Sequence, residues 1–265
     1  MKIEDFAEES RRFLNEVLNA AKNSSGEESS ENHSFRRKFI LIHANHVQSL
    51  ADDVIMLEDK GRTGSPPIVV RGMLESLFIL GAATRNPTFF GQKIVYDLEE
   101  SARFARNDAK KADSDGLKQF LIQQAEVAEK TAGNLKLRHN IENPEKWRPC
   151  DCAATAKLFR QYAIDYSNYS RSVHAELFST VIGEDGRTSA HVMRTVAFIC
   201  LETSRFAFGV FPPGASQQFA KKLASLFQQL HQWEQAETTK AMYQSEMAGE
   251  SQIIRHKRAA PFDSN

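Results

Sequence analysis

Apolar residues recur at intervals of three and four along almost the whole chain, and this periodicity is the feature that most constrains the fold. It is the spacing of helices that bury one face, and no stretch alternates polar and apolar residues as a strand does. Glycine and proline, which mark turns, number only 13 and 8 among 265 residues. Scarce turn signals favour long helices. The sequence therefore predicts an all-α protein, a single bundle of about seven to eight long antiparallel helices without a sheet.

Three parts of the chain differ in composition. Residues 2–22 have the pattern of an amphipathic helix, and the polar, low-complexity run 24–32 is typical of a flexible loop. We therefore predict an N-terminal helix and flexible loop over 1–33 and a helical bundle domain over 34–250. The end of the chain, 251–265, is predicted to be a disordered basic tail.

Within the bundle, the periodicity predicts the order and lengths of the helices. They are expected over 34–60, 67–84, 88–112, 153–180, 189–210 and 215–247, with a further helix capped at 113–115. The helix at 88–112 and the one that follows it are expected to form an exposed antiparallel hairpin, followed by a connector over 139–152. The helix at 67–84 is apolar nearly all round, which predicts a central position.

Charge and cysteine usage limit the compartment and the partners. Lysine plus arginine and aspartate plus glutamate both number 34, so the net charge gives no global attraction to nucleic acid or membrane. We expect no sequence-specific DNA binding. The N-terminus lacks the pattern of a secretory signal, and the apolar stretch 68–83 is interrupted by Arg71 and Glu75, so no membrane span is expected. Three cysteines do not make a disulfide framework, which favours the cytoplasm.

The sequence lacks the motifs of the common metal and cofactor sites. Cys150 and Cys152 form a lone C-x-C without a second pair, and no Glu-x-x-His motif of a di-iron bundle occurs. The G-x-S-x-G, P-loop and G-x-G-x-x-G motifs are also missing, so no motif supports a hydrolase, an NTPase or a dinucleotide-binding protein. We expect no metal and no cofactor.

Two charged residues stand out in the apolar helix at 67–84. Arg71 and Glu75 are four residues apart and share one helix face. A charge in a dry interior costs several kcal/mol unless it is paired and hydrogen-bonded. Arginine before glutamate is the weaker order for a pair within one helix, which indicates a further partner from another helix. Glu202 and Arg205 repeat the same theme later in the chain.

A polar seam in the helix at 153–180 is expected to supply those partners. Tyr162, Tyr166, Ser170 and His174 follow one another every four residues. His174 has the side chain best suited to proton transfer near neutral pH. The set forms either a site or a structural polar network. If it is a site, the candidate catalytic residues are His174, Arg71 and Glu75, and the candidate ligand-binding residues are Tyr166, Ser170 and Tyr162.

Three stretches carry a family resemblance: VVRGMLESLFIL (69–80), the connector around Trp147, and YAIDYSNYSRSVHAEL (162–177). Together they resemble a bacterial family of unknown function that combines an R-x-x-x-E helix with a later Tyr-x-x-x-Ser-x-x-x-His helix. Such proteins are similar to HEPN bundles, which include prokaryotic ribonucleases and nucleotide-binding modules of defence or toxin systems. The resemblance implies RNA or a nucleotide as ligand.

The HEPN ribonuclease hallmark is an arginine, four to six further residues and then a histidine. Arg171 and His174 are too close to fit it, whereas Arg37 and His43 have a permitted spacing. The run 36–38, which contains Arg37, is otherwise interpreted as the solvated end of a helix.

The sequence leaves two classes of function open, and with them the question of whether the protein is an enzyme. The first is a non-catalytic ligand- or partner-binding module with a buried polar network. The alternative is a HEPN-like ribonuclease or nucleotide-binding effector. Homodimerisation is a further hypothesis, because the apolar helix at 189–210 and the phenylalanines around its end offer a large apolar surface. These are Phe198, Phe206, Phe208, Phe211 and Phe219.

Overall fold

All regular structure in the described part of the chain is helical. The computed structural model describes residues 2–23, 31–62, 65–173, 189–211 and 214–258. The α-helices are α1 (Ile3–Asn23), α2 (Glu31–Asp59), α3 (Pro66–Arg85), α4 (Phe89–Ala109), α5 (Asp115–His139), α6 (Pro149–Ala156), α7 (Phe159–Gln161), α8 (Ser167–Val173), α10 (Ser189–Ala207) and α11 (Gln217–Arg258). A π-helix, η1 (Tyr162–Tyr166), and a 3₁₀ turn, η2 (Phe208–Val210), complete them. The prediction of an all-α protein is confirmed.

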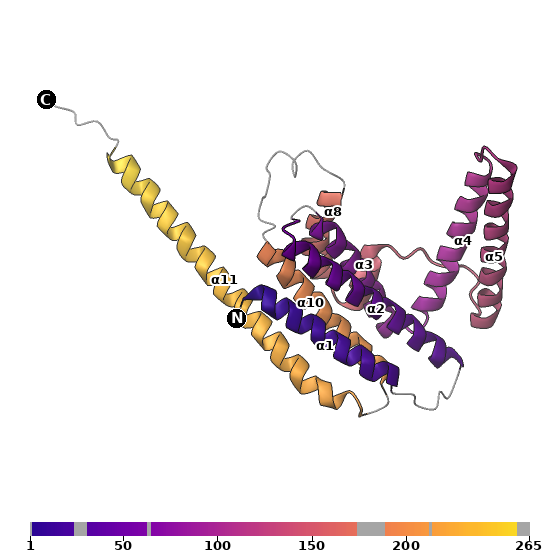
Figure 1. Ribbon diagram of the computed structural model, residues 1–265, viewed down its shortest axis with the longest axis horizontal. Coiled ribbons are helices and arrows are strands. Elements are labelled where there is room, and N and C mark those ends of the chain that lie inside the picture. Colours follow the sequence, from indigo (N-terminus) through magenta and orange to yellow (C-terminus); the bar gives the residue numbers. More distant parts are fainter. Residues whose placement is uncertain (1, 24–30, 63–64, 174–188, 212–213, 259–265) are drawn as a thin grey trace.

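Helix α3 is central, as its all-round apolar pattern predicts. It contacts α2 along its length and is also covered by α6 and α10 (Figure 1). Two prolines open it, where the missing N–H groups would have no intrahelical acceptor. The side chains that it buries completely fill the middle of the core, namely Val70, Met73, Leu74, Leu77, Phe78 and Leu80.

Helix α1 contributes to the same hydrophobic core as the rest of the bundle. Its buried face, which includes Phe6, Phe13 and Val17, packs against α10 and α2. Helix α2 begins at Glu31, inside the loop predicted over 24–32. Residues 24–30 lie outside the described part of the chain.

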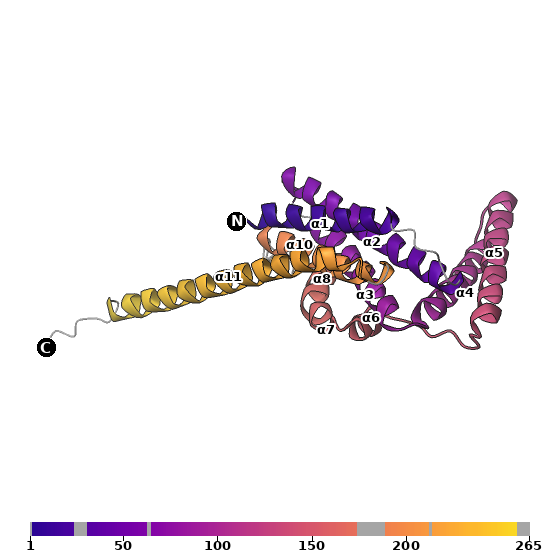
Figure 2. The same ribbon diagram turned by 90° about the horizontal axis from the view of Figure 1, so that it is seen from below.

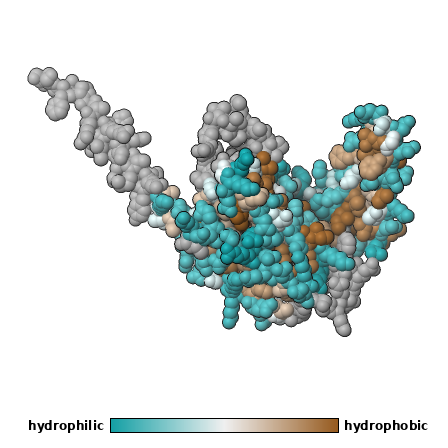
Figure 3. All heavy atoms as spheres, viewed as in Figure 1, coloured by the Kyte–Doolittle hydropathy of each residue, from teal (hydrophilic) through white to brown (hydrophobic). Residues whose placement is uncertain are grey.

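The α4–α5 hairpin projects away from the body of the molecule (Figures 1 and 2). Its two helices meet mainly through small residues that are buried but do not belong to the central core cluster, namely Val95, Ala102, Ala109, Ala125 and Ala132. Ser114 caps α5, where its hydroxyl accepts from the Leu117 N–H at 3.3 Å. The predicted hairpin is confirmed, and apolar side chains show on its outer surface (Figure 3).

The single helix predicted over 153–180 is wrong. The chain forms α6, α7, η1 and α8 instead, because Lys157 adopts a left-handed conformation with φ 60°. Its N–H donates to the Ala154 carbonyl at 3.0 Å, and the Leu158 N–H donates to the Ala153 carbonyl at 2.8 Å, the two bonds of a Schellman cap. Lysine gives no sign of such a cap in the sequence, since glycine or asparagine usually occupies it.

Two other boundaries differ from the prediction. Helix α6 begins at Pro149, inside the predicted connector, where the Asp151 carboxylate accepts from the Arg148 N–H at 3.1 Å. Helix α11 continues to Arg258, into the predicted tail, and residues 259–265 lie outside the described part of the chain.

Most phenylalanines proposed as a dimer surface are in contact with one another and with the core. The Phe208 and Phe219 rings stack with centroids 6.4 Å apart, and Phe219 also meets Phe13 of α1 edge-on at 6.1 Å. Phe198 and Phe211 are half-buried against the same core. Within the described residues, much of this apolar surface is therefore covered by the chain itself, and the homodimer stays a hypothesis.

One helix among the described residues, α3, is long and apolar enough to cross a membrane by length and composition. The core helix of a bundle satisfies the same test, and 61% of the apolar window of α3 is buried inside the protein. Its composition is therefore explained by its central position.

Two glycines of α3 differ in how closely a neighbour approaches them. A Cβ at Gly81 would lie 2.5 Å from the Ala156 Cβ and 2.8 Å from Cζ of Phe206, whereas a Cβ at Gly72 would meet only Leu50 Cδ1, at 3.6 Å. We expect Gly81→Ala to lower the free energy of unfolding by about 2 kcal/mol through overpacking. Gly72→Ala, its control, should raise it by up to about 1 kcal/mol through helix propensity. Urea unfolding measures both, and equal effects would contradict a close α3–α6 contact.

Candidate functional site

Arg71, Glu75 and Tyr166 form a closed polar triad between α3 and the end of η1. The Arg71 Nη2 lies 3.1 Å from the Glu75 Oε1 and donates to the Tyr166 hydroxyl oxygen at 3.2 Å. The Tyr166 hydroxyl donates to the same Glu75 oxygen at 2.8 Å. The expectation that another helix supplies a partner for this pair is confirmed.

The triad lies at the edge of the core and not inside it. The Arg71 and Glu75 side chains keep 25% and 38% of their surface exposed. Arg71 and Glu75 therefore do not lie in a dry interior. Solvent reaches both charges, so the pair avoids most of the desolvation cost of a buried salt bridge. Tyr166, in contrast, is buried.

An aromatic surface extends from the triad toward solvent, and we call Phe159, Tyr162 and Tyr166 the aromatic ledge. Tyr162 and Tyr166 stack with ring centroids 5.2 Å apart, and Phe159 adjoins Tyr162 at 5.8 Å. The Arg71 guanidinium lies 5.5 Å from the centre of the Tyr166 ring, within the range of a cation–π contact. Phe159, at the outer end, is 56% exposed. The ledge thus joins an exposed ring to a positive charge.

The electrostatics of the triad fix the protonation of two members. Burial, together with the bond to the Glu75 carboxylate, raises the pKa of the Tyr166 phenol above its usual 10. The hydrogen bond to Tyr166 raises the pKa of Arg71 further, so its guanidinium stays charged. Neither group can take up or release a proton near neutral pH.

The two residues at the end of the π-helix η1 contact different neighbours. The Ser167 N–H that follows it donates to the Tyr162 carbonyl, an i→i+5 bond. Tyr166 joins the triad, while the preceding residue, Asp165, faces α10. Single π turns occur often at functional sites, and here the turn separates two polar clusters.

The remaining predicted site residues are only partly placed. Ser170 lies half-buried on α8, one turn beyond Tyr166. His174 lies outside the described residues, so its proposed catalytic role stays a prediction. The second charged pair is formed, because the Arg205 Nε donates to the Glu202 Oε2 at 2.8 Å.

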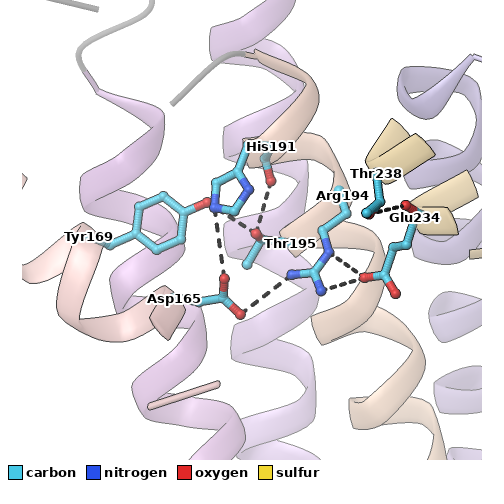
Figure 4. A network of polar contacts seen from close by, with 7 residues as sticks. All are labelled: Asp165, Tyr169, His191, Arg194, Thr195, Glu234 and Thr238. Atoms are coloured by element: carbon cyan, nitrogen blue, oxygen red, sulfur yellow. Dashed lines mark hydrogen bonds and ion pairs between the residues drawn. The ribbon is translucent and has the colours of Figure 1, made fainter. Parts of the chain in front are cut away.

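A second polar cluster surrounds Asp165, which is only 4% exposed (Figure 4). The sequence-based predictions did not include this cluster. We call Asp165, His191, Arg194 and Glu234 the Asp165 cluster. Arg194 of α10 donates from Nε to the Glu234 Oε1 at 2.7 Å, and its Nη1 lies 3.4 Å from the Asp165 Oδ2. The His191 Nε2 is 3.8 Å from the other Asp165 oxygen. The cluster connects η1, α10 and α11.

Hydroxyl groups extend the Asp165 cluster into the core (Figure 4). The Tyr169 hydroxyl donates to the Thr195 Oγ1 at 3.1 Å, and Thr195 donates to the His191 carbonyl at 2.9 Å. The Tyr169 ring also stacks on the His191 imidazole, with centroids 5.9 Å apart. His191, Arg194 and Thr195 share α10, but their contacts with Asp165, Tyr169 and Glu234 cross between separate elements, which no spacing within one helix predicts. The only sequence signal is an aspartate among three tyrosines.

Arg37 and His43, the pair with HEPN-like spacing, face different surroundings on α2. The Arg37 Nη2 donates to the carbonyl of Ala21 at the end of α1, at 2.7 Å. The His43 ring packs on Phe39 with centroids 4.5 Å apart. Burial, reinforced by the positive charges of His46 and Lys93, lowers the pKa of His43 to about 4. His43 is therefore neutral at physiological pH.

Among the described residues, no group of three or more histidine, cysteine, aspartate or glutamate side chains is arranged to hold a metal ion. Burial raises the pKa of Cys152 and of Cys200 to about 12, so both stay protonated thiols and are poor metal ligands or nucleophiles.

Comparison of the chain with protein-family models, with curated proteins and with solved structures found no match. The resemblance to HEPN-like bundles therefore stays a prediction, and the geometry of the side chains is what bears on function.

The burial of Asp165 predicts that its partner Arg194 contributes strongly to stability. In Arg194→Met the Asp165 carboxylate keeps its buried position and loses its guanidinium partner, so we expect the free energy of unfolding to fall by about 3 kcal/mol. The matched control is Arg106→Met, which breaks the exposed ion pair between Arg106 and Glu129 on the hairpin. That change should cost less than about 1 kcal/mol. Urea unfolding compares the two, and equal losses would show that Asp165 is solvated.

The low pKa of His43 predicts a loss of stability in acid. Above pH 6.5 the imidazole is neutral in the folded and the unfolded chain. Below pH 6.5 the unfolded chain binds a proton that the folded chain excludes until about pH 4. Stability therefore falls with pH by up to about 1.4 kcal/mol per unit.

The measurement is urea unfolding at pH 7.5 and pH 5.0. His43→Gln should reduce the loss between these two values by about 2 kcal/mol compared with the unmodified chain. The control His231→Gln changes an exposed histidine on α11, away from His43, and should leave the loss unaltered. A His43→Gln chain with the full loss would show that His43 is not responsible.

Proposed function

We propose that this chain is a non-catalytic ligand- or partner-binding module of the cytoplasm, and that its ligand or partner docks on the aromatic ledge beside Arg71. The observation that carries the proposal is the closed triad. Arg71, Glu75 and Tyr166 direct their hydrogen bonds at one another, and neither Arg71 nor Tyr166 can exchange a proton near neutral pH. Such a closed group is suited to position and recognise a ligand.

The ledge favours a partner with a flat apolar surface and a negative charge. An exposed ring at Phe159 beside the stacked Tyr162 provides a stacking surface, and Ile164 adds an exposed apolar side chain. Stacking of a base or aromatic ring on such a surface contributes about 1–3 kcal/mol. The partly exposed Arg71 guanidinium adds attraction for a phosphate or carboxylate.

The test measures binding of adenosine 5′-monophosphate to the full chain by ligand-observed NMR. We expect saturable binding that weakens about tenfold in Phe159→Ala, the size of one lost stacking contact. The matched control is Phe104→Ala, because Phe104 on the hairpin is exposed to almost the same degree, 55% against 56%. Binding that is insensitive to Phe159, or equally sensitive to Phe104, would exclude the ledge as the binding surface.

The competing function is a HEPN-like ribonuclease or nucleotide-binding effector that uses His174. Incubation of the chain with single-stranded RNA and with ATP distinguishes this function from the proposed binding module. We expect both to remain intact, and His174→Ala to change neither result. RNA cleavage or ATP hydrolysis that disappears in both His174→Ala and Arg71→Gln, with an unchanged melting temperature, would establish an enzyme and overturn the proposal.

A further inference from the structure

A cavity lies at the base of the α4–α5 hairpin, apart from the aromatic ledge. It has a volume of about 350 Å³, enough for a small organic molecule. Its walls are Arg36, Pro87, Thr88, Phe90, Gly91, His139 and Ile141, contributed by α2, the start of α4 and the end of α5. Arg36 contacts α3 at Thr84, whereas the triad uses Arg71. Thr84 and Arg71 are thirteen residues apart on α3, which is roughly 20 Å along the helix.

The walls combine an apolar surface with one fixed positive charge. Phe90, Pro87 and Ile141 supply aromatic and aliphatic contacts, and the Phe90 ring meets the His139 ring edge-on at 5.9 Å. No carboxylate is among the described residues that line the cavity. The charge of Arg36 is therefore not balanced by any acidic residue of the wall.

The Arg36 guanidinium has a hydrogen-bond donor without an acceptor. Its Nη2 donates to the Thr84 carbonyl at 2.6 Å, which ties α2 to the end of α3. Its Nε is buried and has no hydrogen-bond partner. A guanidinium carries five N–H groups, and a buried donor without an acceptor costs about 1–3 kcal/mol. A carboxylate is the acceptor that suits such a group best, because it can take two parallel hydrogen bonds.

Helix α4 begins at the cavity and reinforces this preference. Its N-cap residue, Thr88, makes no side-chain capping bond to the helix, and its hydroxyl donates to the Asn86 Oδ1 at 2.9 Å. The positive end of the helix dipole lies at this first turn and favours an anion. Gly91, also in the wall, keeps the space open, since a Cβ there would approach the Ile141 Cδ1 to 3.2 Å.

We propose that this cavity, the Arg36 cavity, binds a small organic carboxylate with a flat apolar body. The carboxylate pairs with the Arg36 guanidinium at the α4 end of the cavity, and the apolar body lies against Phe90, Pro87 and Ile141. The site is independent of the function proposed for the aromatic ledge, with which it shares no residue.

Two probes of the same shape separate charge from apolar contact. Naphthalene-2-carboxylate and its neutral amide, naphthalene-2-carboxamide, are titrated calorimetrically into the full chain. We expect the carboxylate to bind the Arg36 cavity with the same affinity in Phe159→Ala, in which stacking on the aromatic ledge is lost. The amide should bind the cavity about tenfold more weakly, as the loss of a charge-assisted hydrogen bond requires. Equal affinities, or no saturable binding of the carboxylate, would overturn the proposal.

Arg37 provides a matched control for Arg36. The two are neighbours on α2, and each donates through Nη2 to the last turn of another helix, Arg36 to Thr84 and Arg37 to Ala21. Only Arg36 lines the cavity. Arg36→Gln should weaken the carboxylate about tenfold and leave the amide unchanged, whereas Arg37→Gln should alter neither. Equal losses in both variants would trace the effect to folding and refute an Arg36 contact.

A second variant keeps the test independent of the stability of Arg36→Gln. Gly91→Leu fills the cavity from a helical position and leaves Arg36 in place, so it should abolish binding of both probes while the helical circular dichroism is retained. A folded Gly91→Leu chain that still binds the carboxylate would place the probe elsewhere. Phe159→Ala should have no effect, which separates this site from the aromatic ledge.

Discussion

The burial of α3 is the constraint on which the rest of the structure depends. Its apolar side chains need cover from α2, α6 and α10, and Gly81 lets Ala156 of α6 approach the α3 backbone closely. The chain that leaves α6 then remains beside α3, so that η1 reaches Arg71 and Glu75. The position of the triad thus follows from how the core helix is covered, and its polar bonds are added at the edge of an interface that apolar contacts have already formed.

Two short irregularities turn this packing into distinct polar sites. The left-handed Lys157 ends α6 and redirects the chain, and the π turn of η1 shifts the helical register at its end. Beyond them, Tyr166 contacts α3 and Asp165 contacts α10. The partly exposed triad resembles a recognition surface, whereas the Asp165 cluster, whose central carboxylate is buried between η1, α10 and α11, resembles a device that fixes how these helices pack.

The periodicity of apolar residues was sufficient to predict the fold class, the hairpin and the central place of α3, because burial on one face imposes that spacing locally. The four-residue spacing of Arg71 and Glu75 identified a real pair in the same way. The exposure of that pair did not follow from the sequence, since the pattern shows that neighbouring positions are apolar and not where the covering helices end. The Asp165–Arg194–Glu234 contacts and the Arg36 cavity join residues from different helices, and no spacing within one helix encodes them.

The sequence by itself therefore determined the helices, the core helix among them, and the charged pair on its face, because these depend on the order of residues within a few turns. Tertiary structure alone decided that the pair meets solvent, that Asp165 is buried beside Arg194, and that Arg36 borders a cavity. The physical reason is that desolvation and hydrogen-bond partners are properties of the space between helices. That space is set by packing across the whole chain, which local periodicity does not specify.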